Sequence, residues 1–333
     1  MAEHPVRHRP KLYPPPEFPP RKVALFARTP PAVFPVILGL LGLATALRMA
    51  AAQWGTGQEI ADLAAGLAVP VWAFAVLAYS VKIVRRISVI ADDLKVMPAR
   101  AGLAAATMGG MVAAGHLGVF VPKLAVPLLL LMIALHAALA VLTVRVLLGL
   151  PAEARQINPG WHMTFVGFIV AAPPAAMLGL DELARGLLFL TLPVALAIWG
   201  ISLAQLARRV PPAPLRPMLA IHLAPASLFA STAALTGLPL LSAGFGLLAL
   251  AILLALLASL RWITESGFSP LLGAFTFPMA AAATALMQQV GALAWVGQGL
   301  LLLALGVIPW IAWQVLSLWP GGRLAARTNA AEA

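Results

Sequence analysis

The sequence contains no cysteine and few charged residues, and each shortage excludes a class of protein. Without cysteine the chain can form no disulfide, no thiolate metal site and no cysteine nucleophile. Asp, Glu, Lys and Arg make up 10% of the 333 residues, whereas a soluble domain has about 25%. Because 62% of the residues are apolar and the mean hydropathy is +0.95, water cannot be the main solvent of this chain.

Long apolar runs fill most of the chain, and their length matches a lipid bilayer. A helix needs about 20 predominantly apolar residues to cross the hydrocarbon core. Continuous runs favour helices over the alternating strands of a membrane barrel. The sequence therefore predicts an all-α polytopic membrane protein with ten transmembrane helices, over residues 32–52, 60–83, 101–121, 124–148, 162–180, 184–206, 216–236, 238–260, 269–289 and 293–317.

The net charge of +11 follows this predicted topology. With the N-terminus inside, all but three of the 22 Lys and Arg residues lie on the inner side, and the three outside are Arg48, Lys123 and Arg185. This asymmetry places both termini in the cytoplasm of a bacterial inner membrane protein. It also argues against a nucleic-acid partner, because a basic groove needs clustered Lys and Arg with stacking aromatics on a soluble fold.

Three regions are expected along the chain. Residues 1–31 form a basic, proline-rich cytoplasmic arm that lacks the apolar segment of a secretory signal. Residues 32–317 form the transmembrane domain, and residues 318–333 form a cytoplasmic tail. The ten spans pair into five helical hairpins, because loops within pairs are short and nearly free of charge whereas loops between pairs are basic. The regular spacing of the hairpins indicates a weak fivefold repeat.

The predicted spans contain few groups that could do chemistry. Every Asp and Glu in this region lies near a span end or in a loop, so no metal quartet, carboxylate pair or nucleophile–base set can be assembled. We therefore expect no enzyme, no cofactor and no metal site. His136 lies near mid-membrane and is the candidate for proton-linked work. Alternatively, it is a packed histidine that hydrogen-bonds to a neighbouring helix.

The ninth span is the most informative about transport. Gly273, Phe277, Ala281 and Thr284 recur at helical spacing, so one bulky ring stands on a stripe of small residues. Such a ring can plug a lumen, or it can simply pack or face lipid. Small residues and prolines elsewhere let helices approach closely or leave a lumen open. The full set of pore-lining candidates is Gly39, Gly110, Gly167, Pro225, Gly273, Ala281 and Thr284.

At these residues the chain resembles the tellurite-resistance and dicarboxylate transporter family, which includes the slow anion channels of plant guard cells. The resemblance covers nearly the whole span region and rests on four short motifs, Phe34 through Leu40, Asn158-Pro159-Gly160-Trp161, Leu223-Ala224-Pro225-Ala226 and Ala274-Phe275-Thr276-Phe277-Pro278. It implies five hairpins around a central pore lined by the odd-numbered helices. It also implies a homotrimer with one pore in each subunit, and a gate at Phe277 that occludes the pore.

Three departures from the family pattern concern selectivity. Gly273 stands where the family often has tryptophan, Pro35 precedes the usual proline position, and Phe168 replaces a common asparagine. The leading hypothesis is a passive, gated channel for small inorganic or organic anions, with membrane lipid as the other partner. The alternative is a proton-coupled C4-dicarboxylate transporter or a tellurite-resistance exporter that uses a group such as His136. A membrane enzyme or assembly factor would need a polar constellation that the sequence does not supply.

Overall fold

A computed structural model describes residues 24–333, and within that range the chain is helical without any strand. The all-α prediction is therefore confirmed, whereas most of the predicted arm over 1–31 lies outside the described residues. In the described part, nine helices are long and apolar enough to cross a membrane. They are α1 (Phe34–Trp54), α2 (Gln58–Arg85), α4 (Met97–Phe120), α5 (Pro122–Leu148), α7 (Asp181–Arg208), α8 (Leu223–Leu235, extended by η5, Ala213–His222), α9 (Pro239–Ala258), α11 (Thr276–Met287, extended by η6, Pro270–Phe275) and α12 (Ala292–Leu316).

The remaining predicted span, over 162–180, is a shorter apolar helix, His162–Met177. It changes type along its length, from a π-helix η3 (His162–Val166) to a 3-10 helix η4 (Gly167–Ala171) and then to α6 (Ala172–Met177). Its ends nevertheless fall close to the predicted ones. Apolar length alone therefore located this segment but did not predict its irregular backbone.

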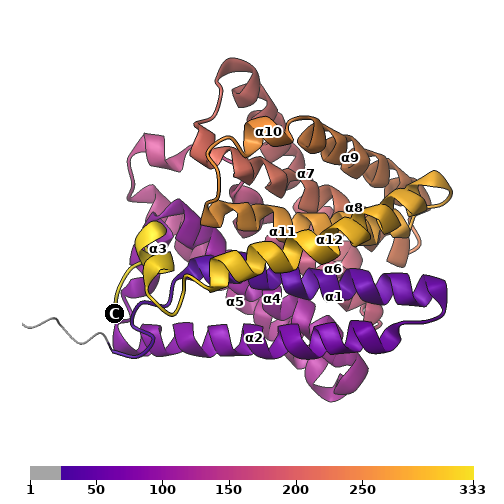
Figure 1. The fold of residues 1–333 in the computed structure, drawn as a ribbon, viewed down its shortest axis with the longest axis horizontal. Helices are drawn as coiled ribbons and strands as arrows, with labels where there is room; N and C mark the ends of the chain where they lie inside the picture. Colours follow the sequence, from indigo (N-terminus) through magenta and orange to yellow (C-terminus); the bar gives the residue numbers. More distant parts are fainter. Residues whose placement is uncertain (1–23) are drawn as a thin grey trace, which may run out of the picture.

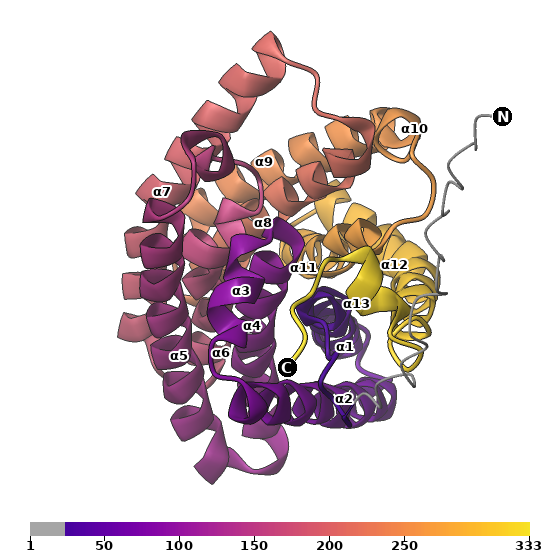
Figure 2. The same ribbon diagram turned by 90° about the vertical axis from the view of Figure 1, so that its left-hand side faces the viewer.

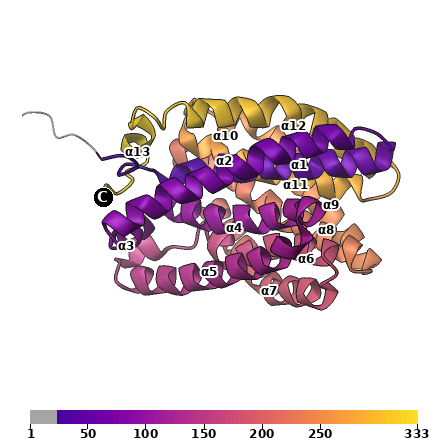
Figure 3. The same ribbon diagram turned by 90° about the horizontal axis from the view of Figure 1, so that it is seen from below.

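The helices form an inner ring and an outer layer. In the inner ring, α1 contacts α4, α4 contacts α6, α6 contacts α8, α8 contacts α11, and α11 returns to α1. Each inner helix also packs against the next long helix in the chain, which lies outside the ring. Figure 2 shows this arrangement nearly end-on, with α2, α5, α7, α9 and α12 around the periphery. Figure 3 shows the long helices side by side, with α2 and α12 on the edge opposite α5 and α7.

Burial follows the same division. Of the most apolar stretch in the spans that contain α1, α4, α8 and α11, between 61% and 78% is buried, against 22% to 39% for the spans of the outer layer. The inner helices are rich in Ala and Gly, which allows close approach. A Cβ atom on Gly39 of α1, for example, would collide with Thr276 of α11. Small residues therefore bring the ring together, and large apolar residues cover the outside.

Prolines mark where the inner helices become α-helical. A 3-10 segment precedes the α-helix in four of these spans: η1 (Pro31–Val33), η4, η5 and η6. In the α-helical parts that follow, the first turn contains Pro35, Pro173, Pro174, Pro225 and Pro278. A first-turn residue has no intrahelical acceptor for its N–H, so proline fits there without breaking a bond. In contrast, Pro70, Pro127, Pro193 and Pro309 lie inside outer-layer helices.

The two ends of the described chain meet at one end of the bundle (Figure 1). Asp93 in the short helix α3 (Val89–Lys95) is fully buried and pairs with Lys82 Nζ at 2.9 Å. Tyr79 donates a hydrogen bond to the same carboxylate at 2.8 Å, and the backbone N–H of Ala331 donates one at 2.7 Å. The tail, which includes α13 (Arg323–Arg327), is therefore anchored beside the start of α1.

Candidate functional site

Two cavities lie within the inner ring, and one side chain contributes to the lining of both. The first, of about 240 Å³, extends to Arg327 and Thr328 in the tail, and we call it the inner cavity after the predicted topology. The second, of about 220 Å³, extends to Arg48 and Gln288 at the other ends of α1 and α11, and we call it the outer cavity. Among the described residues, Phe277 alone lines both cavities.

Phe277 is held by its neighbours on α1 and α11. It is the second residue of α11 and is 7% exposed. Its ring fits against Gly42, where a Cβ atom would lie 2.9 Å from the Phe277 Cδ2 atom. The hydroxyl of the preceding residue, Thr276, shares its hydrogen between the carbonyls of Gly273 and Pro35, and the contact with Pro35 ties the start of α11 to α1. The ring is therefore placed by a glycine on one helix and a short polar anchor on the other.

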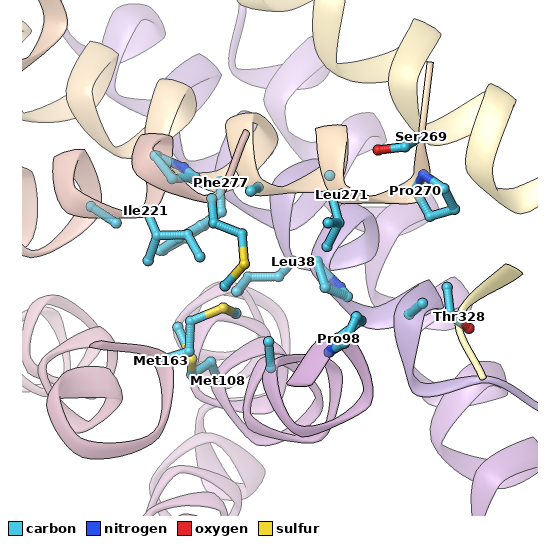
Figure 4. Close-up of a pocket in the computed structure, with 18 of the residues that line it drawn as sticks. Leu38, Pro98, Met108, Met163, Ile221, Ser269, Pro270, Leu271, Phe277 and Thr328 are labelled. Carbon is cyan, nitrogen blue, oxygen red and sulfur yellow. The ribbon is translucent and has the colours of Figure 1, made fainter. Parts of the chain in front are cut away.

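The inner cavity has an apolar wall. Figure 4 shows Phe277, Ile221, Met163 and Met108 at one end of it and Ser269, Pro270 and Thr328 at the other. The hydroxyl of Ser269 is buried without a hydrogen-bond partner among the described residues. The only charged side chain that the described structure places in this wall is the exposed Arg327.

More polar residues line the outer cavity, although its surface is also mainly apolar. Its lining includes Thr45, Arg48, His116, Ser231, Thr284 and Gln288. The Nε2 atom of His116 lies 3.0 Å from the carbonyl of Leu41, so the imidazole donates to the backbone of α1. Thr284 donates to the carbonyl of Ala280 within α11 at 3.0 Å. These side chains come from α1, α4, α8 and α11, so the cavity is a product of the whole ring.

The predicted pore-lining residues divide between cavity walls and helix contacts. Gly273 lines the inner cavity, whereas Ala281 and Thr284 line the outer cavity. Pro225 is buried in the first turn of α8. The three remaining glycines lie where helices touch, and a Cβ atom on Gly39, Gly110 or Gly167 would collide with Thr276, Met132 or His136, respectively.

His136, the predicted proton-linked residue, is fully buried between α5, α4 and η3. Its Nδ1 atom lies 2.7 Å from the Thr107 hydroxyl, and its Nε2 atom lies 3.1 Å from the carbonyl of Thr164. Its ring packs edge-on against Phe168, with the ring centres 4.6 Å apart. Both ring nitrogens therefore have partners within the protein, and His136 is absent from the lining of the inner and outer cavities.

A comparison with known protein families identifies the family of this chain. The family model described as "voltage-dependent anion channel" matches residues 28–316, a range that includes all the long helices. The chain belongs to this family. None of the curated proteins matches the chain. Members of the voltage-dependent anion channel family are channels or transporters rather than enzymes, and a role in anion transport follows for this chain. The family is the one that the four sequence motifs indicated.

Sequence reasoning missed part of the polar lining in this member of the voltage-dependent anion channel family. Arg48 was assigned to the outer side from topology alone, and neither Ser231 nor Gln288 was singled out. A signal for Arg48 does exist in the sequence. Gly42, Thr45, Met49 and Ala52 recur at helical spacing beside it, and all of them line the outer cavity. This stripe, which is mostly small and polar residues in an apolar helix, therefore marks the side that faces the cavity.

Proposed function

We propose that this chain is a passive, gated anion channel whose pore runs through the inner ring and is occluded by Phe277. The observation that carries the proposal is the position of Phe277 between the inner and outer cavities, as the one described residue that lines both. Movement of this one ring would join the cavities into a path along the bundle.

We also propose a membrane arrangement for this channel. The ten predicted spans form five hairpins over residues 32–317, with His162–Met177 as the fifth span because α6 completes the inner ring. Large apolar side chains exposed on the outer helices, such as Leu67, Leu131 and Leu196, supply a surface for lipid. The charge asymmetry supports cytoplasmic termini and a bacterial inner membrane. The family resemblance suggests a homotrimer with a pore in each subunit.

The electrostatics of the cavities favour anions over cations. None of the described residues that line the two cavities is Asp or Glu, whereas each cavity has one arginine. The exposed Arg327 at the inner end raises the local concentration of anions. Arg48 at the outer end contributes less, because Asp62 offsets its charge. Because the inner wall is apolar, selectivity should follow the ease with which an anion loses water.

The alternative function is a proton-coupled transporter of C4-dicarboxylates or an exporter that confers tellurite resistance. Two cavities on either side of one occluding side chain also suit a protein that exposes its substrate to each side in turn. In that case His136 or the cavity-lining His116 would take up the coupled proton. The two functions differ in whether net anion current flows without a proton gradient.

The deciding experiment compares anion current through the purified wild type and Phe277→Ala in planar bilayers. A gated channel should show anion-selective reversal potentials and a large increase in conductance in the variant. Phe189→Ala is the matched control, because Phe189 is an exposed phenylalanine on α7 outside both cavity linings. Absence of current in every variant, together with pH-driven dicarboxylate or tellurite flux in liposomes, would replace the channel with the transporter.

A further inference from the structure

The outer cavity contains a guanidinium with unused hydrogen-bonding capacity. Arg48 has a side chain that is 16% exposed, and its Nη2 atom donates to Asp62 Oδ1 of α2 at 2.6 Å. Its Nε–H is buried and has no partner among the described residues. Arginine has five N–H donors in a rigid fork, and a buried donor without an acceptor is costly. Arg48 therefore lines the cavity with a charge and at least one free donor.

A second orphaned group lies in the same cavity wall. The Oε1 atom of Gln288 is buried without a partner, and Gln288 is the residue that follows α11. The oxygen and nitrogen of a glutamine amide can exchange places by rotation, so this group can present an N–H instead. The hydroxyl-bearing residues Thr45, Ser231 and Thr284 line the cavity as well. Two residues with unsatisfied groups, Arg48 of α1 and Gln288 just after α11, therefore line the same cavity.

The space suits a small anion with part of its hydration shell. A water molecule occupies roughly 30 Å³ in the liquid, so a cavity of about 220 Å³ has room for one small ion and several waters. Polar side chains and water together can replace the hydration that the ion loses. A large organic anion would have to displace these waters and the apolar side chains of Met49 and Leu228.

We infer that the outer cavity is a binding site for a small inorganic anion such as chloride or nitrate, in which Arg48 is the principal donor and Asp62 limits its strength. The inference rests on the proposed function, since the site would hold a permeating ion on the outer side of Phe277. Conduction requires a site that attracts an ion and still releases it. Asp62 shares the charge of Arg48 and so keeps the ion from binding too tightly.

A purely structural role for the Arg48–Asp62 pair predicts different effects of substitution than an anion-binding role does. If Arg48 and Asp62 only join α1 to α2, then removing either partner breaks the same link and both variants change in the same direction. If Arg48 binds an anion against the pull of Asp62, the two variants change in opposite directions. Arg48→Gln weakens anion binding, whereas Asp62→Asn strengthens it.

The test measures the half-saturating chloride concentration for current, with chloride varied on the outer side and gluconate keeping the ionic strength constant. Arg48→Gln should raise this concentration by about tenfold, as expected for the loss of a charge-assisted hydrogen bond. Arg48→Lys should recover part of the loss, and Asp62→Asn should lower the concentration. Arg185→Gln is the control, because Arg185 lies on the same side of the membrane but donates to Thr236 and Glu182 outside the cavity lining.

A second measurement separates this inference from the channel itself. The thermal unfolding of the purified protein in detergent is followed as chloride or nitrate replaces gluconate. Stabilisation by chloride in the wild type that is lost in Arg48→Gln supports the site, even if no current is ever observed. The opposite result is current that persists while Arg48→Gln and Asp62→Asn leave the half-saturating chloride concentration unchanged or shift it in the same direction. That result would overturn the binding site and leave the channel proposal intact.

Discussion

The Phe277 ring rests in a space that exists only because residue 42 is glycine. A Cβ atom on Gly42 would lie 2.9 Å from the ring and 3.1 Å from the Cβ atom of Ala280, closer than ordinary side-chain contacts. The position of the ring therefore depends on α1 as well as on α11. Enlarging residue 42 is a way to disturb the proposed gate without changing Phe277 itself.

We predict that Gly42→Ala raises basal anion conductance severalfold, because it destabilises the occluding position of Phe277 relative to any other position of the ring. Single-channel recording measures the effect. Gly66→Ala on α2 is the control, since a Cβ atom there meets nothing within 4 Å. In the Phe277→Ala background, Gly42→Ala should add little. An equal increase in both backgrounds would show that the added methyl group acts independently of the ring.

Arg327 should concentrate anions at the inner mouth of the pore. Arg327→Gln is expected to lower the conductance for anions that arrive from the inner side at low salt, and the effect should fade as the salt concentration rises, because mobile ions screen an exposed charge. Arg323→Gln changes another exposed arginine of α13 outside the cavity lining and should have a smaller effect. Equal reductions by both variants would point to a general surface charge.

The Lys82–Asp93 pair should be essential for stability. Asp93→Ala leaves a buried ammonium without its partner, which typically costs about 3–5 kcal/mol. It also removes the acceptor for Tyr79 and for the tail at Ala331. Asp92→Ala removes the neighbouring, half-buried carboxylate that pairs with Arg86 and Lys95 near the surface and should have a small effect. Thermal unfolding in detergent compares the two variants, and similar losses would contradict the prediction.

His136 distinguishes the channel from its alternative. Replacing it by glutamine disturbs its hydrogen bonds to Thr107 and Thr164, so we expect a loss of stability of about 1–3 kcal/mol. The pH profile of anion flux should stay unchanged, because His136 lies outside the linings of both cavities. Thr143→Val, a change to another buried polar residue of α5, is a control for disturbing that helix. If His136→Gln lost pH-dependent uptake and Thr143→Val kept it, the coupled transporter would be favoured.

Nine of the ten predicted spans correspond to long apolar helices in the described part of the chain, because the thickness of the bilayer sets the length of an apolar run. Phe277 could be singled out because one ring among Gly273, Ala281 and Thr284 breaks a simple pattern. The side on which a small residue lies was harder to predict. Glycine occurs both where helices touch and where a lumen is open, so the residue type does not distinguish the two. Gly39, Gly110 and Gly167, which were predicted to line a pore, lie at helix contacts.

Contacts between distant segments were beyond the reach of the sequence. His162 and His222 lie 3.0 Å apart through their ring nitrogens although 60 positions separate them, and no local pattern indicates such a pair. The 3-10 starts of the inner spans are continuous with the apolar α-helices that follow them, so the hydropathy of a whole span does not reveal them. Arg48 was overlooked because counting charges by topology assigns a side of the membrane but says nothing about a cavity.

The separation into an inner ring and an outer layer also determines how this protein can evolve. The five peripheral helices are less buried than the ring helices, so exchange of one large exposed apolar residue for another on them should leave the two cavities unchanged. The ring helices have less freedom, since many of their positions are alanine or glycine, and several of the glycines lie at close contacts. New ionic preferences should therefore arise from a small number of substitutions at cavity walls, while the remainder of the chain drifts with the composition of its membrane.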